Sequence, residues 1–143
     1  MRNTVDMKLV RSRLRAGKYR KGCSCRFIVL PNDMGVKMYS SQQKRDFSMS
    51  NQKLAAKHGL APKVFNKLDL ARAIRDVRFG YLTEKVRVYP HIEIPDEIYD
   101  ELDKEFRKIG MIMYDLHSHN VGLTKNGKYI CVDFDIIYSS KDL

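Results

Sequence analysis

Short apolar runs bounded by turn residues are the main pattern in the first half of the chain. Residues 26–30 and 36–39 are two such runs separated by turn residues at 31–35, and residues 79–86 also have strand character. Runs of this length between turn residues are typical of β-strands. Residues 68–77 mix apolar and charged positions, so they fit either a helix or an irregular insert.

The clearest helical pattern lies at residues 96–109. The apolar positions that recur at helical spacing are Ile98, Leu102, Phe106 and Ile109. Pro95 lies next to the first turn, acidic residues fill the first turns, and basic residues fill the last one. This order suits the fixed φ of proline and the direction of the helix dipole. We expect the helix to end at Gly110.

Two other segments have weaker helical patterns. Residues 50–59 predict a short helix, with Ser50 as its N-cap and Gly59 in the left-handed conformation that ends many helices. Residues 1–16 are polar and basic, and they predict no more than one helical turn around residues 9–14. Strands in the first half and helices in both halves indicate an α+β chain.

A β-hairpin signature lies near the carboxyl end. Residues 121–124 and 128–132 are apolar runs, and the Asn-Gly turn at 125–127 predicts a hairpin in which both turn residues take positive φ. Such a hairpin brings its two ends together. The polar residues carried toward that end are Asp115, Asn120 and Asp133. Two carboxylates and an amide are what a phosphoryl-transfer site needs, because they can orient an attacking hydroxyl and hold Mg²⁺.

These residues carry a resemblance to a known superfamily. Residues 115–120, Asp-Leu-His-x-x-Asn, resemble the catalytic loop of the protein-kinase-like superfamily, and residues 133–135, Asp-Phe-Asp, resemble its metal-binding Asp-Phe-Gly. With Gly122 included, the pattern is most similar to small kinase-like proteins of bacteriophages and to aminoglycoside- and choline-kinase relatives. Residues 59–62, Gly-Leu-Ala-Pro, also resemble the aminoglycoside-kinase-like proteins.

The resemblance assigns roles to the polar residues of the hairpin. It implies that Asp115 orients the acceptor hydroxyl and that Asn120 and Asp133 bind Mg²⁺. Two residues depart from the family pattern: Met113 stands where a His is usual, and Asp135 stands where a Gly is usual.

The first half of the chain contributes the expected nucleotide contacts. Lys37 lies between apolar residues and therefore on the opposite strand face from them. It resembles the strand lysine that kinases place on the α- and β-phosphates. Gly22 precedes the strands that would cover the phosphates, since glycine lets the backbone approach an anion. Glu84 and Val86 resemble the hinge whose backbone meets the adenine edge.

The lysine lacks an obvious carboxylate partner. Kinases usually carry a glutamate on the next helix that pairs with the strand lysine, but Asp46 is the only acid between Lys37 and Asp69. Two alternatives stay open. Either Asp46 pairs with Lys37, or neutral side chains such as Asn51 and Gln52 hold it.

Positive charge is concentrated at the amino-terminal side. The net charge is +10; residues 1–63 hold 15 Lys and Arg against 3 acids, and residues 64–143 hold 12 against 14. The densest basic positions are Arg11, Arg13, Arg15, Lys18, Arg20, Lys21 and Arg26. This tract can bind a polyanion such as nucleic acid, or an acidic partner such as a host protein, or it can be a solvated face.

Other classes of protein fit the sequence poorly. The three cysteines are few and odd in number, so a disulfide framework is not expected, and their spacing matches no recognised zinc site. No apolar run approaches the length of a membrane span, and no secretory apolar core follows the first residues. We therefore expect a cytoplasmic protein that has no membrane partner. The cytoplasm can be that of a host cell.

The ordered motifs imply a minimal protein-kinase-like fold of the α+β class. They imply a basic extension at 1–16, an N-lobe with a five-stranded sheet at 17–86, and a truncated helical C-lobe at 87–143. The implied cofactors are ATP and Mg²⁺, and the implied activity is phosphate transfer to a hydroxyl acceptor. The alternatives are a pseudokinase-like module that binds a partner protein, and a basic nucleic-acid-binding protein.

Overall fold

The computed structural model describes residues 5–21, 24–88, 94–113, 116, 120–135 and 137–139. Two units make up the chain, which we call the sheet unit (Met1–Met49 and Val64–Lys85) and the hairpin unit (Ser50–Lys63 and Val86–Leu143). The lobe boundaries that the resemblance implies stay a prediction. The amino-terminal segment belongs to the sheet unit, and Ser50–Lys63 belongs to the hairpin unit.

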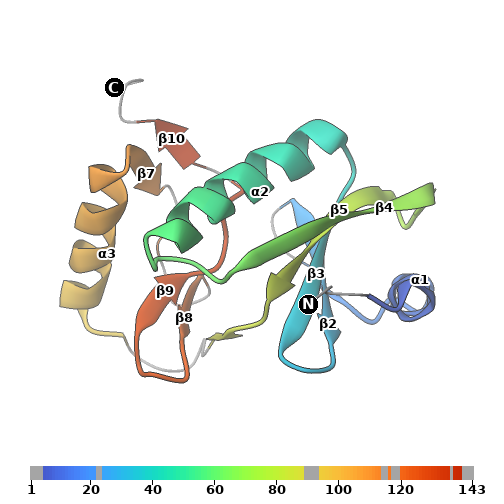
Figure 1. Ribbon diagram of the computed structural model, residues 1–143, viewed down its shortest axis with the longest axis horizontal. Coiled ribbons are helices and arrows are strands. Elements are labelled where there is room, and N and C mark those ends of the chain that lie inside the picture. The colour runs from blue at the N-terminus through green and yellow to red at the C-terminus, as the bar shows by residue number, and fades with distance from the viewer. Residues whose placement is uncertain are drawn as a thin grey trace. The chain divides into compact units, whose positions relative to one another are not determined.

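An antiparallel five-stranded sheet forms the centre of the sheet unit (Figure 1). Its strands are β1 (Arg20–Lys21), β2 (Cys25–Leu30), β3 (Met34–Tyr39), β4 (Val64–Ile74) and β5 (Val77–Glu84). In space they follow the order β1-β2-β3-β5-β4. The prediction of an α+β chain with a five-stranded sheet is confirmed, and the strand that carries Lys37 is the middle one.

The β4 strand corrects our interpretation of residues 68–77 as a helix or an irregular insert. This long strand pairs with β5, and Arg75 and Asp76 form the turn between them with φ of 52° and 67°. Two residues with positive φ match the strand twist of a tight hairpin. The turn was missed because Arg-Asp contains neither glycine nor asparagine. Of the β4–β5 residues near this turn, Leu70 and Val77 are buried.

Helix α1 (Met7–Arg15) covers one face of the sheet with its apolar side. Val10 and Leu14, four residues apart, are fully buried in one cluster with Ile28 of β2. The Asp6 carboxylate caps the helix by accepting a hydrogen bond from the N–H of Lys8 at 3.0 Å. The sequence predicted a single turn here, because so short a helix depends on packing against the sheet rather than on its own propensity.

Helix α2 (Gln42–Lys57) begins well before the predicted start at Ser50. Ser41 marks the true start, since its Oγ accepts a hydrogen bond from the N–H of Lys44 at 3.2 Å. Ser50 lies inside the helix and caps nothing. Gly59 adopts φ 72° after the last turn, which confirms the predicted end. The helix passes from the sheet unit into the hairpin unit after Met49.

The hairpin unit contains one long helix and short strands. Its elements are β6 (Arg87–Val88), α3 (Asp96–Lys108), β7 (Met111–Met113), β8 (Val121–Leu123), β9 (Tyr129–Cys131) and β10 (Ile137–Ser139). Strands β6, β8 and β9 form one sheet, and β7 pairs with β10. Helix α3 confirms the predicted stripe, with Leu102 and Phe106 buried and Gly110 at φ 82° after its end. No helix in the described ranges is long and apolar enough to cross a membrane.

The turn between β8 and β9 is at the predicted place but is of another type. Gly127 adopts φ 78°, whereas Asn126 does not take a positive φ. The N–H of Gly127 donates to the carbonyl of Thr124 at 2.9 Å, and the N–H of Thr124 donates to the carbonyl of Lys128 at 2.8 Å. These bonds fit a three-residue loop in which a single glycine takes the left-handed conformation.

Candidate functional site

Lys37 occupies the middle of the sheet. It lies opposite Phe27 of β2 and Tyr81 of β5, and its neighbours Val36 and Met38 point into the core beneath α1. The alternation that placed Lys37 on the other strand face is therefore confirmed. The residue is only 6% exposed, and its Nζ lies 5.8 Å from the centre of the Tyr81 ring. Contact with the ring face favours the ammonium.

A set of buried hydroxyl groups holds the aromatic side chains beside Lys37. The rings of Tyr39 and Tyr81 are stacked, with centroids 6.1 Å apart. The Tyr39 hydroxyl donates to Ser48 Oγ at 2.7 Å, and Ser48 Oγ shares a hydrogen bond with the Tyr81 hydroxyl at 3.1 Å. Ser48 and both tyrosines are buried. Sequence reasoning missed this set because it placed the start of α2 after Ser48.

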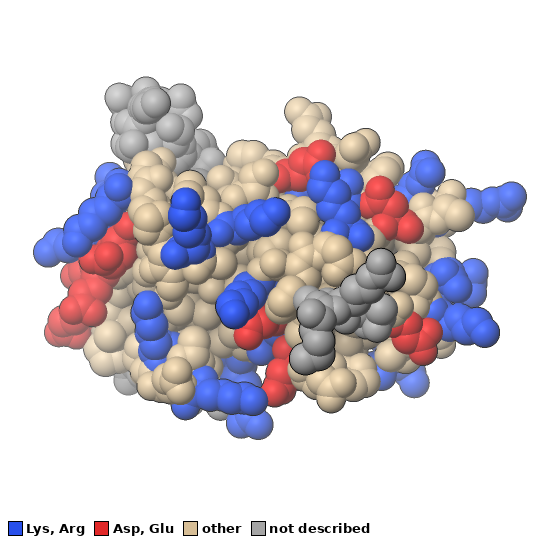
Figure 2. All heavy atoms as spheres, in the orientation of Figure 1, with Lys and Arg blue, Asp and Glu red and all other residues tan. Residues whose placement is uncertain are grey.

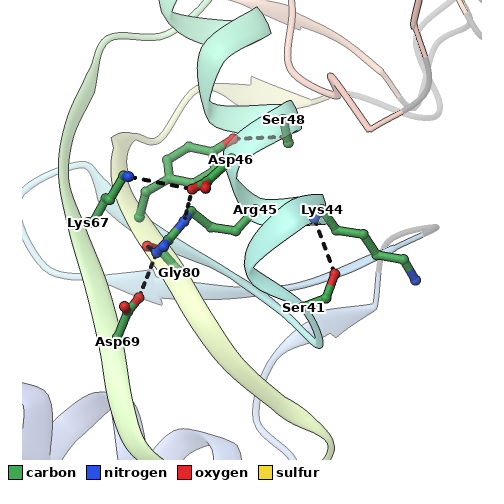
Figure 3. Close-up of polar contacts among 9 residues, drawn as sticks. Ser41, Lys44, Arg45, Asp46, Ser48, Lys67, Asp69 and Gly80 are labelled. Carbon is green, nitrogen blue, oxygen red and sulfur yellow. Dashed lines mark hydrogen bonds and ion pairs between the residues drawn. The ribbon is translucent and has the colours of Figure 1, made fainter.

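The Asp46 carboxylate does not pair with Lys37, which overturns one of our two alternatives. It accepts a hydrogen bond from Arg45 Nε at 2.7 Å and forms an ion pair with Lys67 at 3.5 Å (Figure 3). Arg45 also reaches Asp69 Oδ1 at 2.6 Å and the carbonyl of Gly80 at 2.9 Å. Asp46 is thus paired with Arg45, its neighbour on α2, and with Lys67 on β4, a strand at the edge of the sheet.

The charges of this cluster reinforce one another. Burial acts to lower the pKa of Arg45, but hydrogen bonds from its guanidinium to Asp69 and Asp46 outweigh burial and raise that pKa. The hydrogen bond from Arg45 lowers the pKa of the Asp46 carboxyl. Both groups therefore stay charged at neutral pH. The other alternative, in which Asn51 or Gln52 holds Lys37, stays a prediction; Gln52 Nε2 donates to the carbonyl of Pro62 at 3.0 Å.

The hairpin of β8 and β9 brings two of the expected metal ligands to one end. Val121 pairs with Cys131, and beyond this pair the carbonyl of Asn120 accepts a hydrogen bond from the N–H of Val132 at 2.8 Å. Asn120 directly precedes β8, and Asp133 comes directly after Val132. The paired backbone therefore holds both residues at the same end of the hairpin. Asn120 is 9% exposed, and Asp133 is partly buried.

The donor atoms at this end suit a hard cation. An amide oxygen and a carboxylate are ligands that Mg²⁺ prefers, and Mg²⁺ commonly uses only one or two carboxylates from the protein. Asp133 Oδ1 also accepts a hydrogen bond from the N–H of Asp135 at 3.0 Å, which fixes the carboxylate relative to the backbone. Among the described residues no three His, Cys, Asp or Glu side chains cluster as a metal site.

Two of the expected site residues, Asp115 and Gly22, lie outside the described residues. The elements before Asp115 are described. Met113, where kinases usually have a His, is buried at the end of β7, and Leu116 packs against the core of the hairpin unit. This packing explains why an apolar residue stands at position 113.

The expected hinge follows the end of β5. The carbonyl of Glu84 accepts a hydrogen bond from Thr83 Oγ1 at 3.1 Å, and the N–H of Lys85 donates to the carbonyl of Asp33 at 2.7 Å. The chain passes from the sheet unit to the hairpin unit between Lys85 and Val86. A role for Glu84 and Val86 in binding adenine stays a prediction.

Comparisons with known proteins find a likeness in fold. No family model matches the sequence, and no curated protein matches it either. The fold resembles WbdD, a bifunctional kinase-methyltransferase, in a structure with a TM-score of 0.56 and 16% identity that covers 84% of this chain and 31% of WbdD. A structure of monomeric WbdD gives a TM-score of 0.56 and 17% identity, over 82% of this chain and 33% of the other.

A third matching structure is a complex of WbdD with a kinase inhibitor, with a TM-score of 0.54 and 15% identity over 86% of this chain. This chain therefore spans about a third of the length of the proteins that it matches. At this level of identity the likeness concerns the fold, so any activity has to be argued from the residues themselves.

Proposed function

We propose that this chain is a kinase-like protein that binds ATP with Mg²⁺ and transfers a phosphate to a hydroxyl acceptor. The observation that carries the proposal is the position of Lys37 in a fold that resembles a kinase-methyltransferase. A lysine that is almost fully buried on the middle strand of a sheet is costly to desolvate in its charged form. A buried ionisable group of this kind is a candidate for a functional site, where it can act on a charged ligand.

The proposal gives each residue a role. Lys37 binds the α- and β-phosphates, Gly22 lets the backbone approach them, and backbone groups of Glu84 and Val86 bind the adenine edge. Asn120 and Asp133 hold the metal ion, which when bound neutralises charge on the phosphates. The buried hydroxyl of Ser48 supports the lysine indirectly, by fixing the tyrosine ring that the ammonium faces.

Asp115 acts on the acceptor in this proposal. Its carboxylate accepts the proton of the acceptor hydroxyl as the hydroxyl oxygen bonds to the γ-phosphorus. The bond from that phosphorus to the bridging oxygen breaks, and ADP leaves with the electron pair. The contribution of such a carboxylate is orientation and proton acceptance in the transition state.

One observation favours the alternative of a non-catalytic, pseudokinase-like module that binds a partner protein. Asp46, the acid that stood nearest to the usual position of the lysine partner, is paired with Arg45 and Lys67 instead. Asp46 therefore does not supply the carboxylate that kinases use to position this lysine. Nucleotide binding without transfer would then be the expected behaviour.

A thermal-shift titration tests nucleotide binding. We expect ATP with Mg²⁺ to raise the melting temperature by several degrees, since ligand at about 100 times its Kd adds about 2.7 kcal/mol of stability. ATP alone should have little effect. Asp133→Asn should remove most of the Mg²⁺-dependent shift, because the substitution keeps the shape of the side chain and removes its charge.

Asp103→Asn is the matched control, since Asp103 is a surface residue of α3 that pairs with Arg107. It should leave the shift as in the wild type. No shift in the wild type, with or without Mg²⁺, would contradict the proposed function. A shift that Asp133→Asn does not change would contradict the role of Asp133 alone.

A further inference from the structure

The net positive charge of the chain lies in the sheet unit. This unit holds 17 Lys and Arg against 6 Asp and Glu, whereas the hairpin unit holds 10 against 11. A nucleotide site needs only a few cations, so the proposed function does not account for this excess. The two units therefore have different electrostatic characters, and the sheet unit is the one suited to a large anionic partner.

Helix α1 presents several of these cations in a fixed arrangement. Val10 and Leu14 anchor its apolar side in the core, which directs the other sides outward. Lys8, Arg11 and Arg15 are three and four residues apart and so share one side of the helix. Lys8 and Arg15 are exposed, and Arg11 is partly exposed.

Strand β4 and its turn to β5 add further cations beside this helix. Arg75 Nη2 donates a hydrogen bond to the backbone carbonyl of Arg15 at 3.0 Å, so the turn is tied to the carboxyl end of α1. Leu70 of β4 packs in the same apolar cluster as α1. Arg72 and Arg75 are exposed. Lys and Arg gather at the right-hand edge of Figure 2, where Figure 1 places α1 and this turn.

We call the group formed by these residues the basic surface: its members are Lys8, Arg11, Arg15, Arg72 and Arg75. Within the described residues, none of these five side chains forms an ion pair. The acids on these elements are Asp76 in the turn, Asp69 of β4, which pairs with Arg45, and Asp6, whose carboxylate caps α1. Basic residues in the last turn of a helix favour its dipole, but this accounts for Arg15 and not for Lys8 or Arg72.

We propose that the basic surface binds the phosphate backbone of double-stranded DNA without regard to sequence. Unpaired cations on a helix and an adjoining turn supply phosphate contacts and release counterions from the duplex. A helix with cations along one side fits the wide major groove of B-form DNA, whereas the major groove of duplex RNA is deep and narrow.

Single-stranded nucleic acid is a poorer fit to this surface. Binding of single strands relies on exposed aromatic rings that stack on bases. Tyr19, the aromatic residue in the basic tract, accepts a hydrogen bond from Arg26 Nη1 at 2.7 Å, and the Arg26 guanidinium lies 4.9 Å from the centre of its ring. The ring is thereby engaged within the protein.

Fluorescence anisotropy with a labelled DNA duplex of about 20 base pairs, measured across a salt series, tests the proposal. The test variant combines Lys8→Gln, Arg11→Gln and Arg15→Gln, since glutamine keeps the helix propensity while removing three charges. The matched control combines Lys53→Gln, Lys57→Gln and Lys104→Gln, three exposed helical lysines of the hairpin unit. Both variants have the same net charge.

We expect the test variant to bind at least about tenfold more weakly, with a log–log salt slope shallower by about 1 to 3 units. The control should bind within about twofold of the wild type. Arg72→Gln, on β4 and outside the helix, should reduce the slope by about one unit. Because this substitution leaves α1 unchanged, it separates the loss of a phosphate contact from unfolding of α1. The ATP-induced thermal shift should be unchanged in all variants.

Three results would overturn the proposal. These are no binding of the duplex by the wild type at about 50 mM salt, equal weakening by the test and control variants, and tighter binding to a duplex RNA of the same length. The ATP titration reports on the nucleotide site separately, so failure of DNA binding leaves the proposed function intact, and failure of ATP binding leaves the basic surface intact.

Discussion

Replacing Asp115 with asparagine is expected to slow phosphate transfer by about 10²- to 10⁴-fold while leaving ATP affinity near that of the wild type. The carboxylate accepts a proton from the acceptor only as the new bond forms, so its contribution appears in the transition state and not in the bound nucleotide. The asparagine amide keeps the size of the side chain but cannot accept that proton. Release of ADP or transfer of labelled phosphate would be measured beside the ATP-dependent thermal shift.

Asp103→Asn provides the same chemical change at the surface of α3 and should transfer phosphate at the wild-type rate. Equal rates for Asp115→Asn and the wild type would mean that the transfer comes from a contaminating enzyme. Transfer by neither protein, with a normal Mg²⁺-dependent ATP shift in both, would favour the pseudokinase-like alternative. These outcomes can be told apart because binding and transfer are measured on the same samples.

The elements with strong periodic signals were predicted well. Helix α3 combines an apolar stripe with Pro95 at its start and Gly110 after its end, so three kinds of signal agree at residues 96–108. Strands β2 and β3 are short apolar runs around a turn, and the structure has them at nearly the predicted bounds. In these segments the local pattern and the fold favour the same structure.

The elements that depend on distant contacts were not predicted. Helix α1 is stabilised by burial of Val10 and Leu14 against strands that lie far along the chain. Strand β4 is largely exposed, so it lacks a clear alternation, and its pairing with β5 depends on a turn at Arg75 and Asp76 that contains no glycine, asparagine or proline. Pairing partners of this kind cannot be read from a local window.

The candidate site was likewise predicted only in part. Alternation with Val36 and Met38 was enough to place Lys37 on the face opposite α1. The partner of Asp46 was not predictable, because neighbouring side chains on a helix do not ordinarily face each other, and Arg45 is held by contacts with Asp69 and Gly80 from distant strands. The partner of a carboxylate depends on which strands lie next to it in the fold, and a local stretch of sequence does not show this.

Arg45→Met is expected to reduce the free energy of unfolding by about 2 kcal/mol. Arg45 is 1% exposed and joins α2 to β4 and β5 through Asp69 and the carbonyl of Gly80. Methionine fills similar space but leaves a buried carbonyl without this donor, and it leaves two carboxylates without their shared cation. Asp46 and Asp69 are 42% and 47% exposed, so they regain hydration and the loss stays moderate. Urea denaturation monitored by circular dichroism measures the change.

The neighbouring Lys44→Met is the control, because Lys44 is exposed on the same helix and its side chain forms no ion pair with any residue that the structure describes. Figure 3 shows its side chain pointing away from the cluster. It should change stability by less than about 0.5 kcal/mol. Acid should bring the stabilities of the two variants closer together. The lowered pKa of Asp46 means that its pair with Arg45 stabilises the fold above the unfolded-state pKa, about 3.9, and that this contribution is lost as the pH falls through the lower folded-state value. Arg45→Met should therefore show a weaker loss of stability on acidification than the wild type. Equal stability losses for the two variants at neutral pH would contradict a structural role for the Arg45 cluster.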